Sequence, residues 1–252
     1  VPLHHQVHGG NRSDDSVHQS NLDDLRIILQ RDDFTYVADS KLCTAANLKF
    51  LADFGGTFVT VMPRTWAEDK EFRNTLREGK TRWREIYRHS NKREKDEAPD
   101  VFWSCAGSPR TKSGYRLVWI RSSQKAEDDR LYREKTLRLA ELELTELGLK
   151  INRRRLKTLR AIKGAVRKIL RCRGSEEFLL VTYKEQILLV PQRTRRGRPA
   201  AGDPVQMEKR RTWTLRVRRN ATALTREKRT DGVLPLVSNR KRSSKRAILL
   251  IY

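Results

Sequence analysis

The sequence predicts an α/β protein that contains a long, strongly basic segment. Two short runs rich in β-branched and aromatic residues, 34–38 and 57–61, flank a helical pattern over 44–53. A helix is expected before these runs and an apolar strand near the end of the chain, over 233–237, and such alternation of strands and helices is typical of α/β folds. The third observation is the charge, because 55 Lys and Arg residues outnumber 31 Asp and Glu residues, for a formal net charge of +24.

The first 63 residues carry the clearest pattern. Residues 1–7 predict a short strand, and apolar residues at helical spacing then predict a helix that ends near Arg31. The two apolar runs are expected to be buried strands and parallel neighbours, because a helix connects them. Gly55 and Gly56 end that helix, and Pro63 stops the strand that follows.

From about residue 64 the sequence is more charged, and its elements are predicted from shorter patterns. Residues 91–99 favour a loop, Gly148 is expected to stop a long helix, and Ser243 or Ser244 is expected to cap the last helix, which begins at Lys245. The other expected elements are a strand over 115–121, helices over 126–147 and 153–171, a β-hairpin made by 178–182 and 186–190, and a strand over 212–217.

The charge is unevenly distributed along the chain. Residues 1–150 hold 26 basic and 24 acidic side chains, whereas residues 151–252 hold 29 basic and only 7 acidic ones. The first 60 residues are slightly acidic, with 5 basic against 8 acidic side chains. A field of this sign attracts polyanions, and nucleic acid is the partner we expect. A membrane surface is a weaker alternative, because the sequence has neither a lipidation signal nor a Trp/Lys amphipathic anchor. The sequence also has no apolar run long enough to span a bilayer.

Several classes of chemistry lack their usual motifs. The three cysteines, Cys43, Cys105 and Cys172, have no zinc-binding spacing and are expected to be reduced and structural. Four of the five histidines lie in the first eighteen residues, with no second cluster that would complete a metal site. The sequence also has no glycine-rich phosphate loop and no serine-nucleophile motif.

Asp39 is the first candidate for a functional residue. It follows the apolar run 34–38, and the carboxyl end of a strand is where α/β sheets usually place ligand-binding groups. The structural alternative is that its side chain caps the helix near Thr44 or forms an Asx turn. Metal chemistry normally needs two or more converging carboxylates, which a single aspartate does not supply.

Two basic strings are candidates for DNA contacts. Both are short, so a solvated turn or a charged helix start is the alternative for each. The first string includes an Arg-Gly-Arg-Pro sequence, which is able to lay guanidinium groups along a narrow minor groove. The candidate residues are Arg193, Arg195, Arg196 and Arg198 in the first string, and Arg240, Lys241 and Arg242 in the second.

Five segments together carry a resemblance to a known family. Residues 36–43 (Tyr-Val-Ala-Asp-Ser-Lys-Leu-Cys) and residues 55–64 (Gly-Gly-Thr-Phe-Val-Thr-Val-Met-Pro-Arg) closely resemble bacterial insertion-sequence transposases of the DDE type. Residues 10–14, 196–199 and 231–239 resemble further landmarks of these transposases, in the same order. The similarity therefore spans nearly the whole chain.

The resemblance implies a ribonuclease-H-like mixed sheet with flanking helices, interrupted by a long mixed α+β insertion. On this basis residues 1–63 form the first part of the catalytic core, without its first strand. Residues 64–230 form the basic insertion, and residues 231–252 return to the core and stop before its last helix.

The resemblance also implies an activity, namely metal-dependent cleavage and transfer of DNA strands at the ends of an insertion sequence. Two aspartates and a glutamate would hold two Mg²⁺ or Mn²⁺ ions. Asp39 matches the second carboxylate, while the first is expected upstream of Val1 and the glutamate beyond Tyr252. The chain is therefore expected to carry one of three catalytic carboxylates and to be inactive alone.

The implied partner is double-stranded DNA at the inverted repeats, with two copies of the protein acting on paired ends in the bacterial cytoplasm and nucleoid. The first alternative is a non-catalytic, basic DNA-binding remnant or scaffold protein. The second is a basic protein that binds structured RNA or the ribosome. Preference for duplex DNA over structured RNA would separate this last class from the others.

Overall fold

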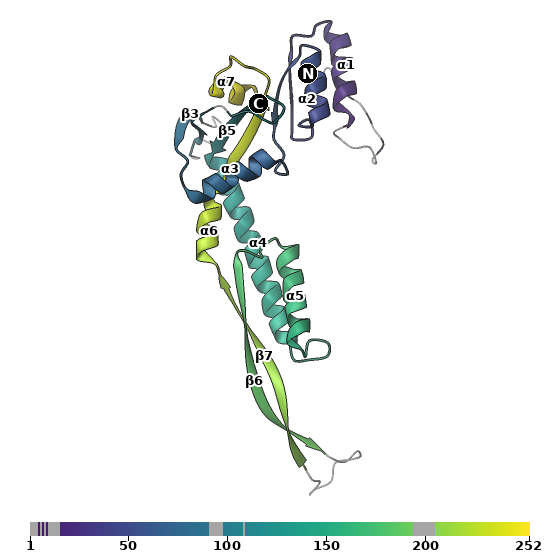
Figure 1. The fold of residues 1–252 in the computed structure, drawn as a ribbon, viewed down its shortest axis with the longest axis vertical. Helices are drawn as coiled ribbons and strands as arrows, with labels where there is room; N and C mark the ends of the chain where they lie inside the picture. Colours follow the sequence, from purple (N-terminus) through teal and green to yellow (C-terminus); the bar gives the residue numbers. More distant parts are fainter. Residues whose placement is uncertain are drawn as a thin grey trace. The chain divides into compact units, whose positions relative to one another are not determined.

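The computed structural model describes residues 5, 7, 9, 16–90, 98–107, 109–193 and 205–252. The chain divides into two compact units, drawn in Figure 1. Unit 1 comprises Val1–Arg130 and Arg226–Tyr252, and unit 2 comprises Leu131–Thr225.

Unit 1 is built on a mixed six-stranded sheet. Strands β1 and β2 are parallel, with Thr35 opposite Thr57, and every other pairing in the sheet is antiparallel. In spatial order the strands are β1 (Thr35–Ala38), β2 (Thr57–Val61), β8 (Val233–Ser238), β5 (Arg116–Ser122), β4 (Asp100–Cys105) and β3 (Trp83–His89). The predicted α/β class, with a mixed sheet and flanking helices, is confirmed.

Helices cover both faces of this sheet. Helices α1 (His18–Leu29), α2 (Ala45–Asp53) and α3 (Ala67–Glu78) pack on one face, where Phe58 of β2 contributes to the core. Helix α7 (Lys245–Ile251) packs on the other face, where Ile248 meets residues of β2, β5 and β8. Each face of the sheet therefore has an apolar core of its own.

The predicted strand–helix–strand pattern over residues 34–61 is confirmed. Helix α2 begins after Thr44, whose hydroxyl accepts a hydrogen bond from Asn47 N (3.2 Å), as an N-cap residue does. Leu48 and Leu51 lie on its buried face. The N-cap of α7 is Ser244, whose hydroxyl accepts from Ala247 N (3.0 Å).

Unit 1 extends beyond the predicted core boundary at residue 63. Strands β3, β4 and β5 all come from the segment assigned to the insertion, 64–230, yet they form half of the unit 1 sheet. The reason lies in β5, whose Val118 and Ile120 are fully buried against Leu236 of β8. The compact units instead divide the chain at residues 130 and 226.

Unit 2 consists of two helices and a two-stranded antiparallel ribbon. Helix α4 (Ser123–Lys150) crosses the boundary at residue 130, and α5 (Leu159–Cys172) follows it. The ribbon pairs β6 (Leu179–Arg193) with β7 (Val205–Arg219) over all fifteen residues of each strand. Helix α6 (Ala221–Glu227) and the short 3-10 helix η2 (Lys228–Thr230) lead back to β8.

Three details of unit 2 differ from the sequence predictions. The hairpin predicted between 178–182 and 186–190 is wrong, because residues 179–190 lie in the single strand β6 and no turn residue separates the two segments. Helix α4 does not stop at Gly148. Helix α5 begins six residues later than predicted, because Thr158 caps it and Asn152 and Arg154 adopt positive φ angles (62° and 46°).

No helix among the described residues is long and apolar enough to cross a membrane.

Candidate functional site

Asp39 lies directly after β1, at the edge of the sheet where the parallel strands β1 and β2 end. Its side chain is exposed. The main chain at this position is fixed, because Asp39 O accepts hydrogen bonds from the Thr60 hydroxyl (2.6 Å) and from Leu42 N (3.2 Å). The carboxylate is therefore presented to solvent from a rigid strand end, and its place directly after a strand agrees with the sequence pattern.

The Asp39 side chain also shapes the loop that follows. Its Oδ1 accepts a hydrogen bond from Lys41 N (2.9 Å), which is an Asx turn, whereas the cap of α2 is Thr44. One of the two structural roles considered for Asp39 is thus present, and the helix-cap role belongs to another residue. The turn leaves the carboxylate exposed and accessible to a ligand.

The end of α7 lies within electrostatic reach of Asp39. Partial burial raises the pKa of the Tyr252 hydroxyl, and the negative charge of Asp39 raises it further. Helix α7 starts beside the end of β4, where Lys245 Nζ donates to Cys105 O (2.5 Å), and Tyr252, on which the charge of Asp39 acts, follows its last residue. A strand-end carboxylate and a helix end therefore approach each other from positions more than two hundred residues apart in the chain.

The described residues alone do not fit the metal ions that the transposase resemblance implies. No group of three or more His, Cys, Asp or Glu side chains within the described ranges is arranged to hold an ion. Asp39 supplies one exposed carboxylate, and Asp23 of α1 is engaged with Arg26 (3.8 Å). A divalent cation usually requires several oxygen ligands, so Asp39 would need further carboxylates to bind one.

The second basic string lies at the opposite edge of the sheet from Asp39. Because β8 is antiparallel to β2, the end of β8 lies beside the start of β2. Arg240 is half-buried there and donates to the Thr35 hydroxyl (2.7 Å) and the Ser243 hydroxyl (3.0 Å), so it joins the start of β1 to the end of β8. Lys241 and Arg242 are exposed. The structure does not bring these three residues to Asp39.

The first basic string lies largely outside the described residues. Arg193 is the last residue of β6, opposite Val205, while Arg195, Arg196 and Arg198 fall in the segment 194–204 that the structure does not describe. Their predicted contacts with DNA stay predictions.

A larger basic surface lies on α5 and the loop before it. Ile162 and Val166 on one face of α5 are buried against α4. The opposite face and the loop carry exposed cations, none of which forms an ion pair with any residue in the described part of the chain. They are Arg153, Arg154, Arg155, Lys157, Arg160, Lys163, Arg167, Lys168 and Arg171. We call this set the α5 surface.

One asparagine attaches the α4–α5 loop to the ribbon. Asn152 Nδ2 donates to Trp213 O (2.9 Å), and its Oδ1 accepts from Trp213 N (2.8 Å). Through these two hydrogen bonds the Asn152 side chain pairs with the β7 backbone as a residue of a neighbouring strand would. The loop arginines that follow Asn152 are therefore held at a fixed point along the ribbon. The sequence offered no signal for this contact, because 61 residues separate its partners.

The ribbon carries a second row of cations on its solvent face. Trp213, Leu215 and Val217 point toward the helices and pack in the core of unit 2. Alternate residues of a strand face opposite sides, so Arg210, Arg216 and Arg218 lie on the other face, and all three are exposed. The sequence pattern predicted the strand over 212–217 but not the length of the arginine row on its exposed face.

The cysteines are not arranged for chemistry. Cys43 and Cys105 are buried, and burial raises the pKa of the Cys43 thiol to about 12 and also raises that of Cys105. Cys172 is exposed at the end of α5. All three are free thiols, in agreement with the prediction that they are reduced.

No protein-family model, curated protein or solved structure gives a significant match to this chain.

Proposed function

We propose that the chain is the central part of a DDE-type DNA transposase, in which unit 1 is a ribonuclease-H-like core and unit 2 binds DNA. The observation that carries the proposal is the position of Asp39, an exposed carboxylate at the carboxyl end of a parallel strand and within electrostatic reach of the end of α7. Strand ends of α/β sheets are where such folds gather their reacting groups. The resemblance of residues 36–43 and 55–64 to insertion-sequence transposases implies that the same residue is a catalytic carboxylate.

The role of unit 2 follows from its charge. It holds 25 basic and 9 acidic side chains, a net charge of +16 in 95 residues, which is two thirds of the total of the chain. Its acidic residues on α4 are largely paired, since Glu134 and Glu141 bind Arg219 and Glu143 binds Arg173. The α5 surface keeps its cations available for phosphate groups, the commonest contacts in a protein–DNA interface.

In this proposal Asp39 would be one ligand of the two Mg²⁺ or Mn²⁺ ions that transposases of this type use. The ions, when bound, activate the attacking oxygen and stabilise the leaving oxygen at a DNA phosphate. The contribution of this chain is to hold a carboxylate in place. The Lys41 N–H occupies one side of Oδ1, and the Thr60 hydroxyl fixes the carbonyl of the same residue. The other two carboxylates would have to come from flanking sequence, before Val1 and after Tyr252.

A non-catalytic DNA-binding protein on the same scaffold is the second candidate. The observation that favours it is that Asp39 belongs to no group of three or more His, Cys, Asp or Glu side chains in the described ranges that could hold a metal ion. Sequencing the coding DNA on both sides of codons 1 and 252 separates the two candidates. An in-frame upstream strand ending in Asp and an in-frame downstream helix bearing Glu are expected for the transposase, and stop codons at both boundaries for the non-catalytic protein.

The decisive variant is Asp39→Asn in the chain extended by its in-frame flanks. We expect it to abolish Mg²⁺-dependent nicking of inverted-repeat DNA, because the amide is a weak metal ligand, while DNA affinity stays within about twofold. The matched control is Asp53→Asn, which neutralises an exposed carboxylate at the far end of α2. Undiminished nicking by Asp39→Asn would remove the residue from the proposed mechanism.

The proposal also fixes the partner and its place in the cell. Duplex DNA at insertion-sequence ends is the partner, two copies would act on paired ends, and the site of action would be the nucleoid in the bacterial cytoplasm. Structured RNA of equal length is the competitor that tests the partner. Tighter binding of RNA than of inverted-repeat duplex by the chain would favour the ribosome-associated class instead.

A further inference from the structure

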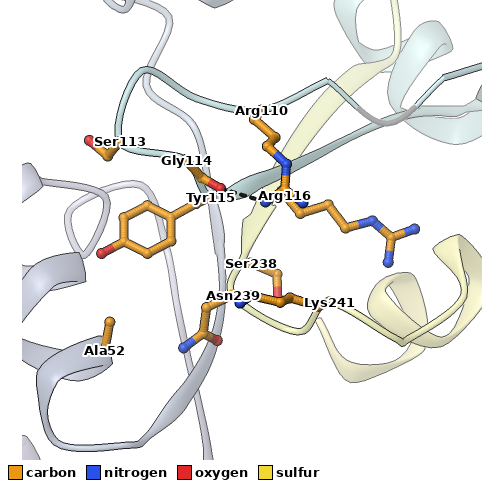
Figure 2. Close-up of a pocket in the computed structure, with 9 residues that line it drawn as sticks. All are labelled: Ala52, Arg110, Ser113, Gly114, Tyr115, Arg116, Ser238, Asn239 and Lys241. Carbon is orange, nitrogen blue, oxygen red and sulfur yellow. Dashed lines mark hydrogen bonds between the residues drawn. The ribbon is translucent and has the colours of Figure 1, made fainter.

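Unit 1 contains a basic cavity at the sheet edge opposite Asp39. Its volume is 480 Å³, which lies within the usual range for small-ligand sites. Figure 2 shows its lining residues, which come from α2, the turn before β5, and the end of β8. They are Ala52, Arg110, Ser113, Gly114, Tyr115, Arg116, Ser238, Asn239 and Lys241. The lining contains three cations and no carboxylate.

Two of the cations are brought together by strand pairing. Arg110 and Arg116 form an antiparallel bridge, so their side chains start from directly opposed positions. Like charges that face each other in this way destabilise a pairing. Each guanidinium has one backbone acceptor, because Arg110 Nη1 donates to Gly114 O (2.8 Å) and Arg116 Nη1 donates to Ser243 O. A guanidinium has five N–H donors, so most of them remain for a ligand.

The third cation, Lys241, has no competing partner. It is exposed and makes no hydrogen bond or ion pair with any residue in the described part of the chain. The neighbouring acidic charge is already compensated, because Asp53, which acts electrostatically on the Tyr115 hydroxyl, is paired with Lys49 Nζ (2.5 Å). An anion that entered the cavity would therefore meet three positive charges without competition from a carboxylate in its lining.

The other walls are rigid. Tyr115 packs edge-on against Phe58 (ring centroids 5.2 Å apart) and its hydroxyl donates to Leu48 O (3.1 Å). Asn239 Nδ2 donates to Gly56 O (2.8 Å), and its Oδ1 accepts from Phe58 N (3.0 Å). In Figure 2 these two side chains lie on one side of the hollow, with Arg110 and Arg116 on the other. Preorganised walls reduce the entropic cost of binding.

We propose that this cavity binds a phosphate group carried by a nucleotide or by a DNA strand, through Arg110, Arg116 and Lys241. Guanidinium groups bind phosphate through paired, charge-assisted hydrogen bonds, and lysine adds a point charge. The volume exceeds what a phosphate alone needs and leaves room for an attached sugar or base beside Tyr115. The site lies at the opposite sheet edge from Asp39 and belongs to unit 1, so it does not depend on the transposase proposal or on the α5 surface.

The test compares two double variants with the same change in net charge. Arg110→Gln with Lys241→Gln removes two cavity cations, and Lys70→Gln with Lys112→Gln removes two exposed cations of unit 1 that do not line the cavity. Calorimetric titration at low salt would use inorganic phosphate, deoxyadenosine 5′-monophosphate, deoxyadenosine and a short DNA duplex. Circular dichroism checks folding, and Lys241→Gln alone serves if the double variant is destabilised.

We expect the cavity variant to bind at least one phosphate-bearing probe about tenfold more weakly than the control variant, with no binding of deoxyadenosine by either. Loss with the free phosphates identifies a nucleotide as the source, and loss with the duplex alone identifies the DNA backbone. Equal binding of every probe by the two variants would overturn the proposal, as would the absence of any phosphate or DNA binding by the unaltered chain. If duplex binding fails but the nucleotide still binds, the DNA-binding role of unit 2 falls while this site stands.

Discussion

Unit 1 and unit 2 use arginine in opposite ways. In unit 1, Arg73 of α3 is buried, with 9% of its side chain exposed, and it binds Asp69 (2.7 Å) and Thr230 O (3.2 Å). In unit 2, Arg219 binds Glu134 and Glu141 from a side chain that is 35% exposed. The first arginine holds α3 against η2 inside the fold, and the second joins β7 to α4 at the surface.

The difference extends to the whole charge pattern. Unit 1 has 30 basic and 22 acidic side chains, and unit 2 has 25 and 9. In unit 1 the acidic side chains therefore offset most of the basic ones. In unit 2 they offset only a minority, and an excess of cations remains on α5 and the ribbon. A high net charge therefore identifies a partner only when its cations are unpaired and exposed.

The largest expected effect is the loss of stability when the buried arginine, rather than the exposed one, is replaced. Arg73→Met leaves the Asp69 carboxylate buried without its partner, and we expect a loss of about 3–5 kcal/mol in the free energy of unfolding. Arg219→Met breaks an exposed network and should cost no more than about 1 kcal/mol. Urea unfolding of both variants measures the difference. Equal losses would contradict the distinction between buried and exposed arginine pairs.

A second pair of variants tests how tightly unit 1 is packed around Gly232, which precedes β8. Gly232 has φ +78°, and a Cβ there would lie 2.8 Å from Ala126 Cβ and also overlap Ser122 O. Gly55 has a similar φ of +75° with open space around it. We expect Gly232→Ala to cost about 3 kcal/mol and Gly55→Ala about 1 kcal/mol, because only the first adds a steric clash to the backbone strain. A similar loss for both in thermal unfolding would mean that the contact at Gly232 relaxes freely.

An effect that appears only at alkaline pH concerns the buried thiol in the unit 1 core. The pKa of Cys43 is about 12 in the folded protein and 9.0 for an ordinary cysteine. Between these values the unfolded chain loses its proton first, so the stability contributed by the neutral thiol is present below pH 9 and is lost as the pH rises toward 12. Cys43→Ala should reduce the decline in this window by up to about 1.4 kcal/mol per pH unit. Parallel declines in the two proteins would contradict burial of the thiol.

The parts of the fold that could be predicted are those set by local patterns. The strands around 34–38 and 57–61, the helix between them and the exposed Asp39 all follow from apolar runs and turn residues within thirty residues of sequence. Helix α3 and strand β3 were missed because their segment is highly charged, and the burial of Arg73 depends on Thr230, which is 157 residues away.

The basic cavity could not be predicted for the same reason. Arg110 and Arg116 are close in sequence, but they meet Asn239 and Lys241 only because β5 and β8 pair, with Arg116 opposite Ser238. The helix over 153–171 was predictable from the spacing of its apolar residues alone. Its attachment to the ribbon was not, because the Asn152–Trp213 contact follows from tertiary structure.

The salt dependence of duplex DNA binding tests the role of unit 2 most directly. If the chain neutralises eight phosphates, log affinity should fall against log salt with a slope of about −7. Replacing Arg160, Arg167 and Arg171 of the α5 surface by Gln should flatten that slope by up to about 3, whereas Lys135→Gln with Arg138→Gln on α4 should leave it nearly unchanged. A slope near zero for the unaltered chain, or one that the α5 changes do not alter, would contradict the assignment of unit 2 as a DNA-binding unit.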